Sequence, residues 1–466
     1  MGDFAAVGAL VYLILSLVPI CAVIWSERKG LARPLTFLVA MTVIYYVVPM
    51  ALAFTDGTAS LSVVPVVLVA TANLLFLAAH QSLPAIDHRT HALRLSVERT
   101  LARLHLGLPG TPATPLLALC LVIGLFSAAA FFSAVGGLGY LCHLNLTGAV
   151  TAGKTYLLWG MLLPKSAALA LSPSRKQLGV TAPLFVVYAA IALLLVVLTG
   201  SRIFLLIGMI QAALIFHFAF RRLRTIEIVG FLVLLLGVAV LYGEYRIESS
   251  TSACAGISVP PTAIDLPGFQ PAGSTSTAPT GLAPGESFTD RLRAKLTNPQ
   301  YLRDRYTANF VDSLYVFRRL YAVVPSETDY LHGASFARLL LQPIPRSLRP
   351  ELPPLPTALT AEFTSPEGGN VFQLWAEAYL NFGSIGVGVI AMLAGFALAA
   401  ATRRVDAVRE TSRRAVLIAL LVTSMLLLYR GSFIGATSVA LMDLIPVLIF
   451  FAVTRSAHGD RQLKSP

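Results

Sequence analysis

Long apolar runs, separated by short polar segments, recur along almost the whole chain. A helix needs about 20 predominantly apolar residues to cross the hydrocarbon core of a bilayer. About eleven stretches meet this requirement. They span residues 5–25, 35–54, 60–79, 114–134, 149–171, 181–199, 203–219, 226–243, 371–400, 415–429 and 433–453. The pattern predicts an all-α, polytopic membrane helical bundle.

The composition strengthens this prediction. Hydrophobic residues make up 56% of the 466 residues and charged residues only 12%. The mean hydropathy is +0.75. Because a soluble domain carries about a quarter charged residues, we expect a multi-pass protein in a membrane rather than a soluble domain.

The positions of the basic residues predict an orientation, because Lys and Arg in short loops are retained on the cytoplasmic side. Placing the N-terminus outside and the C-terminus inside puts 20 of the 35 Lys and Arg residues in cytoplasmic segments. These segments are 26–34, 80–113, 172–180, 220–225, 401–414 and 454–466. The net charge of +12 then mainly reflects topology and contact with anionic lipid, and it gives little support to nucleic-acid binding.

This orientation leaves a large extracytoplasmic loop between the eighth and ninth spans, at residues 244–370. Its 250–288 part is rich in Ser, Thr, Pro, Gly and Ala, which predicts a flexible segment. Its 289–370 part keeps apolar positions at helical spacing beside several arginines, which predicts a partly helical cap. The expected order is 1–243 for the first spans, 244–370 for the loop, 371–453 for the last spans and 454–466 for the tail.

Two arginines stand at tight outward turns between predicted spans. Arg202 follows Ser201 in "TGSR", and Arg430 precedes Ser432 in "YRGSF". A guanidinium group binds phosphate oxygens in a bidentate way, while neighbouring Gly and Ser allow close approach and supply a hydroxyl. The pair therefore favours an anionic phosphate ligand, and the simpler alternative is that each arginine lifts its charge to the interface and meets lipid phosphate.

Four motifs in this order resemble a known family. The chain carries "TGSR" at an outward turn, "PIPRSLRPELP" in the loop, "EAYLNFGSIGVG" at the entry to a span and then "YRGSF". Together they are similar to segments of the bacterial oligosaccharide repeat unit polymerases, the O-antigen polymerase group. The resemblance covers most of residues 190–435 and implies a GT-C-like arrangement in the bacterial cytoplasmic membrane.

The resemblance implies an enzyme, a membrane glycosyltransferase that acts on the outer face of the cytoplasmic membrane. It joins repeat units carried on polyprenyl (undecaprenyl) pyrophosphate into a surface polysaccharide. No nucleotide sugar is available on that face, so the donor carries its own leaving group. Arginines can offset the charge of the departing pyrophosphate without a metal or another cofactor. The implied partners are the lipid-linked oligosaccharide and the bilayer, with a chain-length regulator and a flippase as further candidates.

Under this interpretation Arg202 and Arg430 bind the pyrophosphate, beside Ser201 and Ser432. Other arginines of the outward segment are further candidates for substrate binding, although a solvated helix face or lipid contact would also account for each. They are Arg246, Arg303, Arg305 and Arg346.

A base is expected to accept the proton of the attacking sugar hydroxyl. Glu377 is the stronger candidate, because an ionisable group inside a span is costly and usually faces protein or water. Glu244 is a second candidate, although an ion pair with Arg246 would also explain it. Tyr379 and Asn381, on the same segment as Glu377, are expected either to bind substrate or to pack between helices.

His332 leaves a second enzymatic interpretation open, with an exposed bystander as the plain alternative. The related O-antigen ligases transfer a finished glycan from the same carrier to a lipid A core, and a histidine with arginines in the large outward loop is a feature of that group. A flippase or transporter for a lipid-linked oligosaccharide is a third interpretation, but the internal duplication and midplane charges typical of transporters are scarce. The sequence contains no Gly-rich phosphate loop, zinc-binding histidine pair or D-x-D motif.

Overall fold

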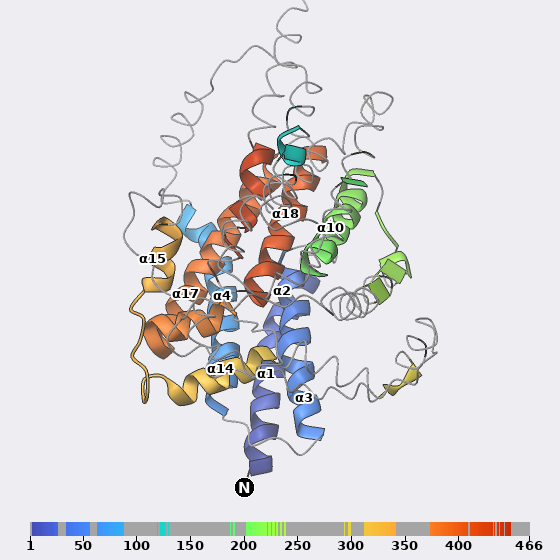
Figure 1. The fold of residues 1–466 in the computed structure, drawn as a ribbon. Coiled ribbons are helices and arrows are strands. Elements are labelled where there is room, and N and C mark those ends of the chain that lie inside the picture. Colours follow the sequence, from blue (N-terminus) through green and yellow to red (C-terminus); the bar gives the residue numbers. More distant parts are fainter. Residues whose placement is uncertain are drawn as a thin grey trace, which may run out of the picture. The chain divides into compact units, whose positions relative to one another are not determined.

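The computed structural model describes mainly residues 2–26, 34–55, 63–87, 202–220, 312–341, 373–408 and 411–431, with scattered residues between 119 and 129, 187 and 191, 222 and 238, 293 and 299, and 433 and 448. Within these parts the chain is almost entirely helical, and they contain no strand (Figure 1). The all-α prediction is therefore confirmed for the part of the chain that can be described.

Helices lie where the apolar pattern predicts them. Four regular helices are α1 (Gly2–Ser26), α4 (Val63–Asp87), α17 (Leu374–Asp406) and α18 (Thr411–Arg430). The second predicted span is a helical run of α2 (Pro34–Thr42), the π-helical turn η1 (Val43–Val47) and α3 (Val48–Thr55). The predicted spans at 114–134, 149–171, 181–199 and 226–243 fall largely outside the described residues.

Two of the described helices are long and apolar enough to cross a membrane. The first candidate span is Val63–Ser82 within α4, and the second is Leu374–Asp406, which is α17. Shorter apolar helical segments occur at Val7–Val23, Leu38–Ala51 and Leu206–Phe218. The chain thus contains apolar helices of membrane-spanning length, as the hydropathy pattern predicts.

The chain divides into two compact units. One consists of Met1–Thr100, Lys295–Ala407 and Leu421–Ala440, and the other of Leu101–Ala294, Val408–Leu420 and Leu441–Pro466. The first unit therefore combines the N-terminal helices with part of the predicted outward loop and with the last helices of the chain.

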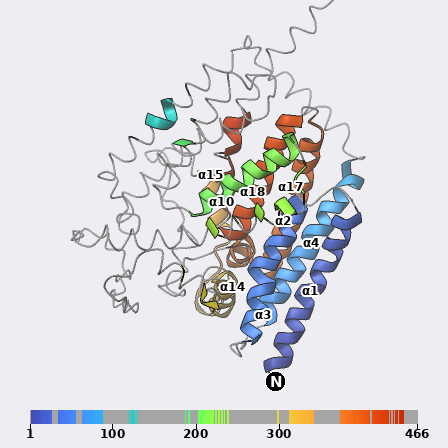
Figure 2. The ribbon, with the colours of Figure 1, turned by 90° about the vertical axis from the view of Figure 1, so that its right-hand side faces the viewer.

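In the first unit α17 packs along α4, and α4 packs against α1 (Figures 1 and 2). The close approach of α17 to α4 depends on Gly395, because a Cβ atom there would collide with the backbone carbonyl of Phe76. Small residues allow helix backbones to approach in this way in membrane proteins. The helix pair therefore forms the frame on which the remaining segments of this unit pack.

Two helices from the predicted outward loop pack on that frame. They are α14 (Asp312–Val323), which contacts α17, α4 and η1, and α15 (Ala334–Leu341), which contacts α17. Both are amphipathic, and Phe317 of α14 is fully buried. Helical structure is thus present within 289–370, where the sequence pattern predicts a partly helical cap.

A kink divides α17 at Gly383, whose φ is 66° and ψ is −160°. L-amino acids rarely adopt this backbone conformation, whereas glycine does so without a steric penalty. A Cβ at this position would also lie 3.1 Å from the hydroxyl of Tyr330. The kink separates the first part of α17, which carries Glu377, from its long apolar continuation.

The second unit contains α10 (Arg202–Ile215), which continues into the π-helical turn η3 (Phe216–Phe220). The backbone N–H of Leu223 donates to Nδ1 of His217 at 3.0 Å, which holds the turn at the end of this helix. Buried Gln211 donates from Nε2 to Oδ2 of Asp443 at 3.5 Å. Polar side chains inside this apolar unit therefore meet one another rather than hydrocarbon groups.

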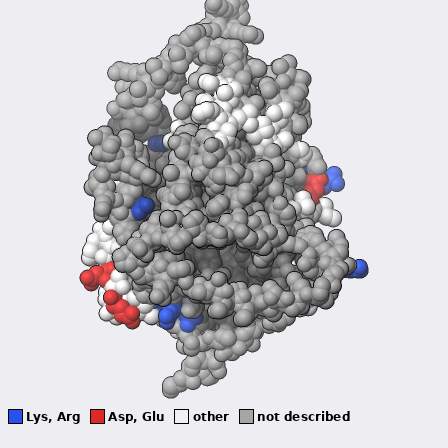
Figure 3. Space-filling model, viewed as in Figure 1, with Lys and Arg blue, Asp and Glu red and all other residues white. Residues whose placement is uncertain are grey.

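Charged side chains of the described residues stand in small separate groups on the face shown in Figure 3. Large apolar side chains are exposed on the helices of the first unit, for example Leu15 of α1 at 59% and Ile385 of α17 at 81%. Helices that are apolar on the outside as well as the inside suit a lipid surrounding better than water.

Candidate functional site

Glu377 lies in the first turn of α17 with 0% of its surface exposed. Its backbone N–H donates to the carbonyl oxygen of Gln373 at 2.9 Å, so the helix begins one turn before it. The helix N-terminus favours a negative charge, but burial of a carboxylate is costly unless its oxygens receive hydrogen bonds. The partners of Glu377 therefore decide what this side chain can do.

Both carboxyl oxygens of Glu377 accept hydrogen bonds from neutral donors. The hydroxyl of Ser335 donates to Oε1 at 2.7 Å. The backbone N–H of Phe433 donates to Oε2 in a short hydrogen bond. A carboxylate has about four lone-pair positions, so further acceptor capacity is left on each oxygen.

Asn381 fixes the direction of the Ser335 hydroxyl. Its Nδ2 donates to Oγ of Ser335 at 2.7 Å and to the backbone carbonyl of Glu377 at 2.8 Å. Because Oγ of Ser335 accepts a hydrogen bond from Asn381, the hydroxyl proton of Ser335 is left to donate to the Glu377 carboxylate. The three side chains therefore form an ordered chain from amide to hydroxyl to carboxylate.

This network joins three segments that are far apart in the sequence. Ser335 is 42 residues from Glu377, and Phe433 is 56 residues from it. The motif "EAYLNFG" contributes Glu377 and Asn381, and "YRGSF" contributes the N–H of Phe433. Two of the motifs that the sequence analysis singled out thus meet at one buried carboxylate.

Aromatic side chains hold the three segments together. The ring of Phe336 on α15 stacks on Phe382 of α17, with centroids 5.9 Å apart, and meets Phe433 edge-on at 5.0 Å. Such pairs add specific geometry to the burial of apolar surface. The N–H of Phe433 is therefore held against Glu377 by the packing of its own side chain.

Tyr379 packs on the side of α14 and the segment after it. Its hydroxyl donates to the backbone carbonyl of Val324 at 2.8 Å. Its ring contacts Phe317, Tyr321 and Tyr330, with centroids 5.7, 5.4 and 6.1 Å away. These contacts are those expected under the packing alternative for Tyr379, and substrate binding by this residue stays a prediction.

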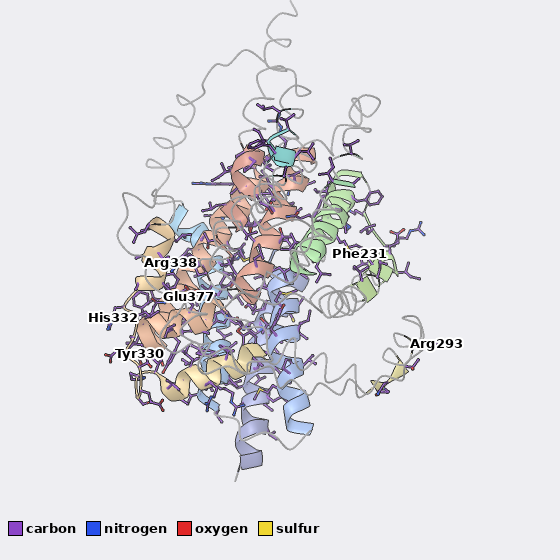
Figure 4. The ribbon with its side chains drawn as sticks, viewed as in Figure 1. Phe231, Arg293, Tyr330, His332, Arg338 and Glu377 are labelled. Carbon is purple, nitrogen blue, oxygen red and sulfur yellow. The ribbon has the colours of Figure 1, made fainter. Side chains whose placement is uncertain are left out.

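His332 is exposed at the edge of this site, where its ring meets that of Tyr330 with centroids 6.4 Å apart (Figure 4). Its φ is 47° and that of Gly333 is 88°. These two left-handed residues turn the chain into α15, while the N–H of Leu331 donates to the carbonyl of Leu380 at 3.0 Å. The turn places Ser335 against Glu377, which Figure 4 shows further inside than His332.

A second buried polar cluster lies at the end of α18. The hydroxyl of Tyr429 donates to Oδ1 of Asn73 on α4 at 3.0 Å and lies 3.3 Å from Oγ1 of Thr42. The ring of Tyr429 also meets Tyr46 and Trp375 edge-on, with centroids 6.5 and 6.2 Å away. This cluster fixes the residue immediately before Arg430.

The two turn arginines occupy different units. Arg202 is the first residue of α10 in the second unit, and Arg430 is the last residue of α18, in the part that belongs to the first. Their side chains are outside the described set, so joint binding of a pyrophosphate stays a prediction. The same holds for the remaining predicted site residues, namely Ser201, Glu244, Arg246, Arg303, Arg305, Arg346 and Ser432.

Sequence reasoning missed Ser335, Gln373 and the backbone N–H of Phe433. Gln373 carried a usable signal, because a polar residue at the start of an apolar span is costly unless it has a partner. A serine in a loop and a backbone amide carry no such signal. Among the residues that can be described, no group of three or more His, Cys, Asp and Glu side chains is placed to bind a metal ion.

Comparisons with known proteins give no relative. No family model matches the chain, and neither the curated proteins nor the solved structures yield a match.

Proposed function

We propose that this chain is a polytopic glycosyltransferase of about eleven spans that polymerises polyprenyl-pyrophosphate-linked oligosaccharide repeat units on the outer face of a bacterial cytoplasmic membrane. One observation carries the proposal: the buried carboxylate of Glu377 accepts a hydrogen bond from the backbone of the turn that contains Arg430. This contact supports the proposal, because it joins a candidate base to the backbone that follows a candidate phosphate-binding arginine.

The reaction requires one base and one site for negative charge. The hydroxyl oxygen of the acceptor sugar forms a bond to the anomeric carbon of the donor glycan. The bond from that carbon to the pyrophosphate oxygen breaks, and its electron pair leaves with polyprenyl pyrophosphate. The proton of the attacking hydroxyl passes to the base.

Glu377 fits the role of the base. Ser335 and the Phe433 N–H orient its carboxylate but leave lone pairs on both oxygens. Burial keeps bulk water from these oxygens, so the charge of the carboxylate is not dispersed in solvent. A carboxylate held in this way is prepared to accept a proton from a sugar hydroxyl that enters the site.

Arg430 is proposed to bind the departing pyrophosphate. It ends α18 directly after Tyr429, which is anchored by Asn73, and it precedes Phe433, which is bonded to Glu377. The backbone around it is therefore held on both sides. A planar guanidinium group on this fixed turn can donate two parallel hydrogen bonds to phosphate oxygens. Arg202, at the start of α10 in the other unit, stays a candidate phosphate ligand that only the sequence suggests.

The test is a deletion strain complemented with variants at matched expression and scored by the length distribution of the surface glycan. Deletion is expected to leave single repeat units on the outer face. Glu377→Gln is expected to do the same, because an amide cannot accept the proton, whereas Glu327→Gln is a matched control at an exposed acid of the same unit. A normal length distribution from the deletion strain would overturn the proposal.

Arg430→Lys tests the phosphate role separately. A lysine keeps the charge but cannot reproduce the planar fork, so polymer length is expected to fall even though the variant is made and inserted normally. A full-length ladder from both Arg430→Lys and Arg430→Gln would contradict the role of this arginine. The same pair of substitutions at Arg202 examines the second candidate ligand.

The position of His332 favours one second candidate, transfer of a finished glycan to a lipid acceptor. His332 is exposed beside the turn that delivers Ser335 to Glu377, so it could meet an acceptor at the edge of the site. The two reactions differ in what deletion leaves behind. A ligase deletion would leave long glycans on the polyprenyl carrier, whereas a polymerase deletion would leave single repeat units.

A further inference from the structure

Two buried polar residues lie one turn apart on α17, and a third is the N-cap residue that precedes the helix. Gln373, Glu377 and Asn381 are spaced every fourth residue, and their exposed fractions are 1%, 0% and 0%. Residues at this spacing share a helix face, and successive members are about 6 Å apart along the axis. The two amides therefore flank the carboxylate, one a turn before it and one a turn after it.

The outer members of this row carry atoms that lack hydrogen-bond partners. In the part of the chain described, these atoms are Oε1 and Nε2 of Gln373 and Oδ1 of Asn381. By contrast, both oxygens of Glu377, the hydroxyl of Ser335 and Nδ2 of Asn381 are hydrogen-bonded. Buried amides without partners are uncommon, and they call for a ligand, a water or a functional role.

The chemistry of the unpaired atoms indicates the ligand class. Two of the three are carbonyl-type oxygens, which need a donor, and the third is an amide nitrogen, which needs an acceptor. A phosphate group offers mainly acceptors, so it cannot satisfy Oε1 of Gln373 and Oδ1 of Asn381. A sugar hydroxyl both donates and accepts, and adjacent hydroxyls on a ring can satisfy an amide at both atoms.

We infer that Gln373 and Asn381 bind hydroxyl groups of the acceptor sugar on either side of the hydroxyl that Glu377 deprotonates. This inference rests on the proposed function. Gln373 is the sharper determinant, because both atoms of its amide are unpaired, whereas Asn381 also orients Ser335. The pair selects an acceptor by its hydroxyl pattern, while the turn arginines bind the pyrophosphate.

The experiment uses the full-length protein in nanodiscs, with the single lipid-linked repeat units that accumulate in the deletion strain as donor and acceptor. Gln373→Met keeps the volume of the side chain and removes its amide. It is expected to raise KM for the acceptor about tenfold, the value of one lost hydrogen bond, with kcat close to the wild type. Gln81→Met, at an exposed position of α4, is the matched control.

A second arm changes the substrate instead of the protein. Acceptors that lack one hydroxyl next to the reacting position are expected to raise KM for the wild type by a similar factor. For one of these deoxy acceptors, Gln373→Met is expected to perform as well as the wild type, because the partner of the amide is already missing. The comparison of full and deoxy acceptors on the wild type needs no variant, so this part of the test stays valid even if Gln373→Met folds poorly.

The outcomes separate the two proposals. If the wild type does not elongate lipid-linked repeat units, the proposed function fails. The inference about the amides fails in a different case, in which the wild type elongates the repeat units and Glu377→Gln does not. In that case Gln373→Met would have the wild-type KM for the acceptor and would discriminate against deoxy acceptors as the wild type does. A rise in melting temperature of Gln373→Met with unchanged KM would show that the amide is buried without a partner and has no role in binding, and it would overturn the inference.

Discussion

Ser335 is the central member of the network around Glu377. Ser335→Ala removes its hydroxyl group and changes the volume of the side chain little. The substitution leaves Oε1 of Glu377 without this hydrogen-bond donor, and Nδ2 of Asn381 loses one of its two acceptors. Since α15 contacts α17 in this region, the loss also weakens the packing of α15 on α17.

The magnitude follows from the two bonds. A hydrogen bond to a charged group contributes about 1.5–3 kcal/mol, and a bond between neutral groups about 0.5–1.5 kcal/mol. Both bonds are 2.7 Å long and both residues they serve are fully buried, so solvent cannot replace the lost partner. We expect Ser335→Ala to lower the free energy of unfolding by about 2–4 kcal/mol. Under the proposed function it is also expected to shorten the polymer, because Glu377 is no longer oriented.

The assay is thermal or denaturant unfolding of the purified protein in detergent, together with the glycan ladder in the complemented deletion strain. Ser326→Ala is the matched control, because Ser326 is exposed and its hydroxyl donates only to the carbonyls of Ala322 and Val323. A surface change of this kind is expected to stay within about 0.5 kcal/mol. If Ser335→Ala behaves like Ser326→Ala in both measurements, the network does not hold Glu377 and the reasoning is wrong.

Two further predictions concern the packing that supports the site. Gly395→Leu forces α17 away from the backbone of Phe76, so the melting temperature should fall sharply, and an unchanged value would contradict the close approach. Tyr429→Phe leaves Oδ1 of Asn73 without its donor and should lower the free energy of unfolding by about 1–2 kcal/mol. The double variant Tyr429→Phe, Asn73→Leu should lose less stability than the sum of the two single variants. Strict additivity in this double-mutant cycle would show that the two side chains are not coupled.

Much of the fold could be predicted from local patterns. Apolar runs of about 20 residues define where α1, α4, α17 and α18 lie, because helix formation in a span depends on the composition of the span itself. Glu377 could be selected in the same way, since an ionisable residue in an apolar run is costly and is kept for a reason. Both conclusions depend only on neighbours in the sequence.

Spacing could not predict which residues surround Glu377. Ser335 and Phe433 reach its carboxylate from 42 and 56 residues away, and neither a loop serine nor a backbone N–H stands out in a sequence. The left-handed turn at His332 and Gly333 and the kink at Gly383 direct these segments to one place. Helical periodicity sets the face of a residue on its own helix, and it carries no information about which other helix meets that face.

The sequence by itself determined that the chain is helical and strongly apolar, and it singled out an acid within an apolar run and two arginines at predicted turns. Only the tertiary structure decided that the acid receives hydrogen bonds from a hydroxyl of α15 and from a backbone N–H after α18, and that both amide atoms of Gln373 and Oδ1 of Asn381 lack partners. The physical reason is that propensity and hydropathy are sums over adjacent residues, whereas a site is a set of contacts between segments whose approach is set by packing.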